Sequence, residues 1–151
     1  MSQDAGQLVV FTLNGEAYAL PIDQVHEIIR FQAPRSVSAS DPCVRGVISL
    51  RGRIVPVYDL GARLGLAVAG QEVAETAKIV IVALGEELAG VVVDSVEEVL
   101  ATDGVEFDEL PSRGTPAIDK VAQVDERLII VLHAEHILEA PTAVTELRAA
   151  A

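Results

Sequence analysis

Residues 8–29 read LVVFTLNGEAYALPIDQVHEII, and the same pattern returns at residues 79–100 as IVIVALGEELAGVVVDSVEEVL. The two stretches align without a gap at an offset of 71. Most aligned pairs exchange one apolar residue for another. Identical residues stand at several aligned positions: Leu13 and Leu84, Glu16 and Glu87, Asp23 and Asp94, Val25 and Val96, Glu27 and Glu98. A gapless match with the acidic residues in register indicates an internal duplication.

Each copy of the repeat predicts three strands. A first apolar strand runs into a tight turn, at Asn14-Gly15 in one copy and at Gly85-Glu86 in the other, and a second strand follows. An Asp-x-Val break then precedes a third short strand, HEII or EEVL. The pattern therefore predicts a β-rich unit that occurs twice.

The distal parts of the two copies match more weakly. GVISLRGRIVPVYDL at residues 46–60 aligns with KVAQVDERLIIVLHA at residues 120–134, and both lead into short helical stretches. In the first of them, the glycine after Arg51 suits a hairpin loop with one residue at positive φ, such as a type I turn closed by a bulge. Because Pro56 has no backbone donor, we expect its strand to lie at an edge or beside a bulge.

The duplication predicts a mostly β fold of two five-stranded units with short helices. Five short strands with alternating aliphatic residues favour a small barrel, which removes exposed sheet edges. Units of this size are marginal alone, so we expect them to share apolar surface. The predicted bounds are a flexible N-terminus at 1–7, one domain at 8–140 with subdomains at about 8–66 and 77–138 and a C-terminal helix able to cross back, and a tail at 141–151.

Composition indicates a folded, cytoplasmic chain. Half of the 151 residues are hydrophobic, only 3% are aromatic, and the mean hydropathy is +0.39. Such an aliphatic core favours strands. The single cysteine, Cys43, cannot form an internal disulfide, which agrees with a reducing compartment. The polar N-terminus is unlike a signal peptide, and charged residues interrupt the best apolar run, so we expect no membrane insertion.

The net charge of −12 argues against two classes of partner. Phosphate backbones and anionic lipid head groups would be repelled, so we expect neither nucleic acid nor direct membrane binding. The charge is compatible with a basic or mixed-charge protein partner. It does not by itself identify one.

The sequence carries little catalytic equipment. It contains no phosphate-binding loop, dinucleotide-binding glycine motif or nucleophile elbow. His133 and His136 stand beside Glu135, but no histidine or cysteine cluster supplies a third metal ligand. The abundant carboxylate pairs are most simply solvated positions. We therefore predict no catalytic residue, no metal and no cofactor, and a protein that is not an enzyme.

The stretch RGVISLRGRIVPVYDL, residues 45–60, closely resembles the signature of CheW-like domains, in which G-V-x-N-L-R-G-x-I-[VI]-P-[VI]-x-D-L is typical. The opening strands resemble those of the family, including the V-x-E-I ending, and AGVVVDSVEEVL resembles its G-[IV]-V-V-D-x-V-x-x-V segment. The resemblance runs from about Leu8 to Leu138, with the motifs in the family's order. Ser49 departs from it, since the family usually has Asn there.

The resemblance implies two SH3-like β-barrels and a non-enzymatic chemotaxis coupling protein. Such a protein links methyl-accepting receptors to the regulatory domain of a CheA-type histidine kinase in signalling arrays at the membrane. Two alternatives remain open at this point. One is an adaptor of the same fold in another receptor–kinase pathway, such as motility, development or biofilm formation, and the other, more remote, is a small-ligand-binding barrel.

The resemblance also implies where partners bind. It places receptor contact along a groove between the barrels and kinase docking in a barrel-to-barrel contact. As a hypothesis, the guanidinium of Arg51 clasps a carboxylate or backbone carbonyls on a partner helix. The positions that match the family's binding residues are Val25, Glu27, Ile28, Gly46, Arg51, Gly52, Val96 and Val99.

Overall fold

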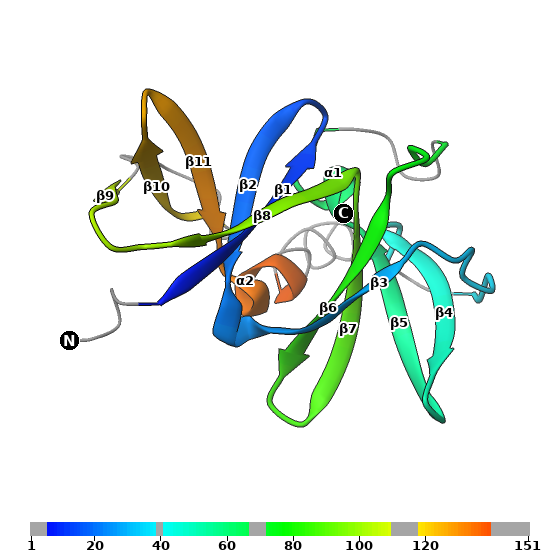
Figure 1. Ribbon diagram of the computed structural model, residues 1–151. Coiled ribbons are helices and arrows are strands. Elements are labelled where there is room, and N and C mark those ends of the chain that lie inside the picture. The colour runs from blue at the N-terminus through cyan, green and yellow to red at the C-terminus, as the bar shows by residue number, and fades with distance from the viewer. Residues whose placement is uncertain (1–5, 39–40, 67–71, 110–117, 140–151) are drawn as a thin grey trace, which may run out of the picture.

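Two β-sheets and short helices make up the computed structural model, which describes residues 6–38, 41–66, 72–109 and 118–139 (Figure 1). The predicted mostly β fold with short helices is confirmed, whereas residues 1–5 and the predicted tail at 141–151 lie outside the described residues. The strands of the first copy are β1 (Gln7–Leu13), β2 (Glu16–Pro21), β3 (Val25–Arg30), β4 (Val44–Leu50) and β5 (Arg53–Asp59). Those of the second are β6 (Lys78–Leu84), β7 (Glu87–Val93), β8 (Ser95–Ala101), β9 (Glu106–Asp108), β10 (Ile118–Val124) and β11 (Arg127–Leu132). A 3₁₀ turn (Ile22–Gln24), α1 (Leu60–Arg63) and α2 (Ala134–Glu139) complete the described elements.

Each sheet combines strands from both copies of the repeat. The six-stranded sheet has the order β8-β1-β2-β11-β10-β9, and the five-stranded sheet has the order β3-β6-β7-β5-β4. The first hairpin of the first copy, β1–β2, therefore lies among strands of the second copy, and β6–β7 lies among strands of the first. The two copies have exchanged their first hairpins.

The exchange is symmetric down to the register. β3 pairs with β6 with Val25 opposite Val82, and β8 pairs with β1 with Val96 opposite Phe11, which are the same positions shifted by 71 residues. Both ladders carry a register shift at the next step. Such a shift marks a β-bulge, which bends the strand locally. The duplication seen in the sequence is therefore a pseudo-twofold relation in space.

The predicted subdomain bounds, about 8–66 and 77–138, do not coincide with the two sheets, because each sheet takes a hairpin from the other copy. Both sheets are open in their hydrogen-bonded order, with β8 and β9 at the edges of one and β3 and β4 at the edges of the other. In each sheet these two edge strands are consecutive in the chain. The segment after β3 also pairs back onto β4 through an Arg35–Val47 bridge.

Three apolar clusters hold the sheets together. One lies on the six-stranded sheet and draws on all of its strands, and a second lies on the five-stranded sheet and draws on all of its strands. The third, here called the central cluster, contains buried residues of β1, β2 and β11 from one sheet, β6 and β7 from the other, and both helices. Successive residues of β6, such as Ile79 and Val80, point to different clusters, as the period of two in a strand requires.

In the β4–β5 hairpin the predicted turn type was wrong, whereas the prediction for Pro56 is confirmed. Leu50 pairs with Arg53, so the loop has two residues, Arg51 and Gly52, and both have positive φ (50° and 84°). This is the geometry of a type I′ turn, not of a type I turn with a bulge. β5 is an internal strand, but Pro56 lies beside the register shift between Val44 and Gly46, which face Tyr58 and Val57, as the alternative of a bulge predicted. The parallel pairing of β5 with β7 begins at Val57, just after Pro56. The proline therefore removes no hydrogen bond from that ladder.

None of the helices among the described residues is long and apolar enough to cross a membrane.

A candidate partner-binding surface on two equivalent edge strands

The edge strands β3 and β8 carry four of the predicted site residues at equivalent positions. Val25 and Val96 are half-buried and pack against the central cluster from the two sheets. Ile28 and Val99, three residues further on, are 37% and 49% exposed. We call these four residues the twin-edge surface. It exposes two apolar side chains to solvent at equivalent places on the two sheets.

Each edge strand turns a glutamate to the face opposite its exposed apolar residue. Ile28 lies opposite Val80 of the central cluster, whereas Glu27 lies opposite Ile81, which belongs to the cluster on the five-stranded sheet. Residues directly opposite each other in a ladder share a face. The predicted set therefore divides between two faces of β3.

Arg51 forms an ion pair with Glu27. This hydrogen bond and charge lower the pKa of the Glu27 carboxyl, while the pKa of the Arg51 guanidinium is raised by the same bond. The Arg51 side chain is 70% exposed, which leaves donors for a partner. The hairpin tip thus reaches the opposite edge strand of its own sheet, where Arg51 and Glu27 form one paired unit.

The second sheet contains an equivalent ion-pair cluster that the sequence analysis did not single out. Arg127, near the tip of the β10–β11 hairpin, pairs with Glu97 and, at 3.5 Å, with Glu98 on the edge strand β8. Glu98 is the repeat counterpart of Glu27. The alignment of Arg53 with Arg127 was the available clue, because it placed a cation on both hairpins.

Gly46 and Gly52, both predicted site residues, have different surroundings. Gly46 is buried with φ of 147°, and a Cβ there would stand 2.2 Å from the carbonyl oxygen of Arg35. Gly46 therefore allows the connection after β3 to pair with β4, and it does not belong to the exposed surface. Gly52 is exposed at the hairpin tip, with no atom within 4 Å of a Cβ built on it.

Two exposed apolar residues escaped the sequence analysis. Ile54 on β5 is 69% exposed and Leu128 on β11 is 61% exposed, the largest values among large apolar side chains of the described residues. They are separated by the same offset of 74 that aligns the two hairpins. Their exposure could not be inferred from the alternation alone, because each follows an arginine in an otherwise apolar strand.

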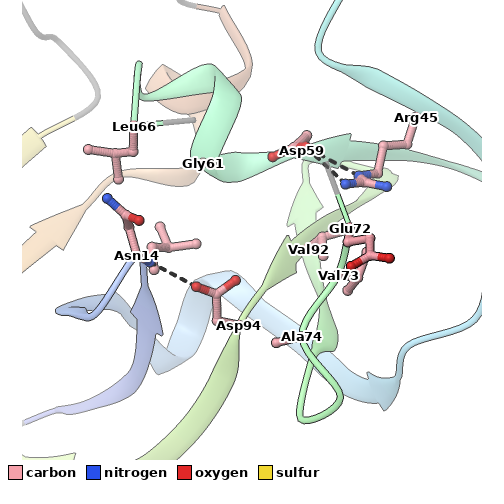
Figure 2. Close-up of a pocket in the computed structure, with 11 residues that line it drawn as sticks. Asn14, Arg45, Asp59, Gly61, Leu66, Glu72, Val73, Ala74, Val92 and Asp94 are labelled. Carbon is pink, nitrogen blue, oxygen red and sulfur yellow. Dashed lines mark hydrogen bonds and ion pairs between the residues drawn. The ribbon is translucent and has the colours of Figure 1, made fainter. Parts of the chain in front are cut away.

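A cavity of about 350 Å³ lies where the β1–β2 turn meets β4, β5 and α1 (Figure 2). Three of the four charged residues that line it, Arg45, Asp59 and Asp94, are engaged within the chain. Arg45 pairs with Asp59 at 3.1 Å, Asp59 caps α1 by accepting from the Ala62 amide at 3.0 Å, and Asp94 accepts from the Asn14 amide at 2.8 Å. The contact between Asp94, which follows β7, and Asn14, in the β1–β2 turn, joins elements of the two sheets at this cavity.

The histidines form no metal centre with other described residues. The rings of His133 and His136 stack at 4.4 Å around the start of α2. Within the described part of the chain, no group of three histidine, cysteine, aspartate or glutamate side chains is placed to hold a metal ion.

Comparison with known proteins identifies the family. The model of the CheW-like domain matches residues 7–142. The chain belongs to the CheW-like family. A chemotaxis protein CheW from Bacillus subtilis (strain 168) is 31% identical over 137 residues, covering 88% of this chain and 86% of the relative. One from Thermotoga maritima is 30% identical over 136 residues, covering 88% and 87%.

A solved structure agrees with the fold of this CheW-like chain. The crystal structure of the scaffolding protein TtCheW from Thermoanaerobacter tengcongensis superposes with a TM-score of 0.75 at 30% identity, covering 85% of this chain and 88% of that one. The departure from the CheW-like signature at Ser49 lies at an exposed position of β4, opposite the exposed Ile54. It therefore changes the surface of the hairpin and not the core.

Proposed function

We propose that this chain is a chemotaxis scaffold that couples methyl-accepting receptors to a CheA-type histidine kinase. Family membership supports scaffolding and not catalysis as its activity. The observation that carries the proposal is the twin-edge surface, because a duplicated fold repeats the same exposed apolar positions on two edge strands beside one central cluster. The chain acts in the cytoplasm and is recruited to receptor arrays at the membrane.

The receptor tip binds the twin-edge surface. Ile28 and Val99 give it apolar contact area at exposed, equivalent positions of β3 and β8. The Arg51–Glu27 pair adds a fixed guanidinium at the margin, which can donate to carboxylates or backbone carbonyls of a receptor helix. Removal of Arg51 should therefore weaken receptor binding without unfolding the chain.

The kinase regulatory domain docks on the hairpins that carry Ile54 and Leu128. Such a domain resembles this chain, so a unit of the kinase domain contacts a similar unit of this chain. Because this chain is pseudo-symmetric, it can form such a contact with two neighbours. Exposed aliphatic residues near hairpin tips suit such contacts. Weak individual contacts add through multivalency in an array.

Closure of each sheet into an SH3-like barrel is part of the proposal. Three features support it: each sheet's edge strands are consecutive in the chain, each sheet has an apolar cluster that draws on all of its strands, and arginines at or near the hairpin tips pair with the edge strands. Hydrogen exchange tests closure. Fast exchange along the whole outer edges of β3 and β8 would contradict it.

The experiment that tests the function is calorimetric titration of the purified chain. The titrants are a receptor cytoplasmic tip and the CheA-type regulatory domain of the same organism. Saturable binding to both is expected. Arg51→Ala should weaken receptor binding more than kinase binding, whereas the control Arg53→Ala, which removes a neighbouring cation that donates to the Glu86 carbonyl at 3.0 Å, should affect the receptor less. Absence of binding to either partner would overturn the chemotaxis assignment and leave the fold intact.

A further inference from the structure

Another cavity, of about 480 Å³, lies between β5, the β6–β7 hairpin and α2, and we call it the α2 groove. Most of its lining is apolar, whereas its charged residues Glu87 and Glu135 are exposed. β5 pairs with β7, so the β4–β5 and β6–β7 hairpins lie side by side at the groove (Figure 1). Its lining includes Pro56, Tyr58, Glu87, Ala89, Glu135 and Leu138.

The internal repeat shows why the two strands are open at this place. In the six-stranded sheet, the parallel pairing of β11 with β2 begins at Ile130 and Tyr18. Their counterparts, at the offsets of 74 and 71, are Pro56 and Ala89, and the parallel pairing of β5 with β7 begins only at the residues that follow these two. Proline has no backbone donor for a further hydrogen bond. The pairing of β5 with β7 therefore starts one step later, beside the groove.

The same two positions of the repeat differ greatly in side-chain size. Tyr18 is 6% exposed, and its side chain belongs to the central cluster. Ala89 is also buried in that cluster, but its side chain is a single methyl group. The α2 groove therefore opens beside an alanine at the position where the other sheet buries an aromatic ring. A ring supplied by another molecule suits such a space, because aromatic side chains bury a large apolar area.

Two carboxylates give the groove a negative potential. Neither Glu87 nor Glu135 forms an ion pair with another described residue. Burial raises the pKa of the Tyr58 hydroxyl. Arg63 opposes this rise, whereas the carboxylates of Asp41 and Glu87 add to it. The charge of Glu87 therefore acts within the groove, and it would attract a cation on a bound partner.

The groove lies next to an exposed apolar part of β5. Ile54 precedes Pro56 by two residues, so it lies on the same face of the strand as Pro56 and Tyr58. The side chain of Ile54 is 69% exposed. A partner that covers this isoleucine can therefore extend a side chain into the groove.

We propose that the α2 groove binds an aromatic side chain of a partner protein that carries a basic residue beside it. The ring packs against Ala89 and Leu138, and the basic residue pairs with Glu87 or Glu135. Because Ile54 is part of the surface proposed for the kinase regulatory domain, that domain is the partner. The inference rests on the proposed function for the identity of this partner and not for the chemistry of the groove.

The test uses N-acetyl-phenylalanyl-lysine amide as the probe, titrated into the full isotope-labelled chain and followed by NMR. The amide signals of β5, β7 and α2 should shift and saturate. The same compound with alanine in place of phenylalanine should have a Kd at least about tenfold higher, because it buries no ring. Equal Kd values, shifts spread evenly over the chain, or no saturable binding of the probe would overturn the proposal.

A variant that fills the groove from within tests the role of the ring. Ala89→Tyr introduces an aromatic side chain at the position that Tyr18 occupies in the other sheet. The variant should keep the circular dichroism of the wild type and should lose binding of the probe. A folded Ala89→Tyr chain that binds the probe like wild type would overturn the proposal.

Charge variants test the groove even if Ala89→Tyr does not fold. Glu87→Gln with Glu135→Gln should raise the Kd for the probe about threefold, since an exposed ion pair contributes modestly. Glu16→Gln with Glu126→Gln removes the same charge from exposed positions, one of them the repeat counterpart of Glu87, and should leave the Kd unchanged. Equal effects of the two double variants would overturn the proposal. The probe contains no part of a receptor or kinase, so this outcome is distinct from a failure of the proposed function.

Discussion

The Arg51–Glu27 pair links the turn of the β4–β5 hairpin to β3, the edge strand at the other side of the five-stranded sheet. Arg51 adopts a positive φ of 50°, which is uncommon for a residue with a side chain. The turn therefore accepts local strain, and the side chain it presents meets a glutamate of β3. We infer that this arginine fixes the hairpin tip against the edge strand as well as offering donors to a partner.

Loss of this pair should be visible in the titration of Glu27. In Arg51→Ala the pKa of the Glu27 carboxyl should rise toward its ordinary value, because its main cause of depression is removed. A carboxyl whose pKa is lower in the folded state than in the unfolded state stabilises the fold at pH values above its unfolded-state pKa. This stabilisation is lost as the pH falls through the folded-state pKa. The difference in stability between wild type and variant should therefore vanish in acid. NMR titration of the side-chain carboxyl checks this. A Glu27 pKa that is the same in Arg51→Ala as in wild type would contradict the Arg51–Glu27 ion pair.

Gly46 and Gly52 should respond differently to alanine. Gly46→Ala should lower the free energy of unfolding by about 3 kcal/mol or more, because it combines an unfavourable φ with a clash against the Arg35 carbonyl. Gly52→Ala should cost only about 1–2 kcal/mol, since its Cβ meets no atom. Urea unfolding measures the free energy of unfolding of both variants. Equal losses would contradict the prediction, because they would mean that the segment after β3 moves aside for a side chain at position 46 at little cost.

The β4–β5 and β10–β11 hairpins carry an exposed apolar residue at equivalent positions, Ile54 and Leu128, as the edge strands β3 and β8 do. Ile54→Asp and Leu128→Asp should each leave the free energy of unfolding within about 0.5 kcal/mol, because both side chains are mainly in solvent. Each should weaken binding to the kinase regulatory domain, and receptor binding should change little. If both variants bind the kinase domain like wild type, the docking face lies elsewhere.

Strands, hairpins and short helices could be read from the sequence because they depend on neighbours within a few residues. The pattern also placed Val25 with Val96 and Ile28 with Val99. The exchange of hairpins could not be predicted from the sequence, because the apolar pattern of β1 would suit pairing with β3 as well as with β8. The positive φ of Arg51 and the burial of Gly46 depend on contacts with distant backbone. The sequence alone does not display such contacts.

The exchanged hairpins make the chain one cooperative unit. β1–β2 completes the sheet of the second copy, and β6–β7 completes that of the first. The central cluster then takes buried residues from both sheets. Since each fully buried aliphatic side chain contributes about 1.5–3 kcal/mol, separating the copies would expose more apolar surface than either could tolerate.

Fragments should therefore fold only together. Residues 1–69 and residues 70–151, expressed separately, should each lack a cooperative thermal transition, because each has a hairpin without its sheet. An equimolar mixture should regain the circular dichroism and the amide dispersion of the intact chain. A stable, dispersed spectrum from either fragment alone would show that the copies are independent domains.

The most direct test of the twin-edge surface measures, by calorimetry, how tightly the receptor tip binds the variants Ile28→Asp and Val99→Asp. Val37→Asp serves as the control, because Val37 is 46% exposed but lies outside the twin-edge surface. Both edge variants should stay folded and lose at least about tenfold in affinity, since each places a charge in an apolar contact, and the control should bind like wild type. Folded edge variants that bind the receptor tip like wild type would contradict the assignment of this surface to receptor binding.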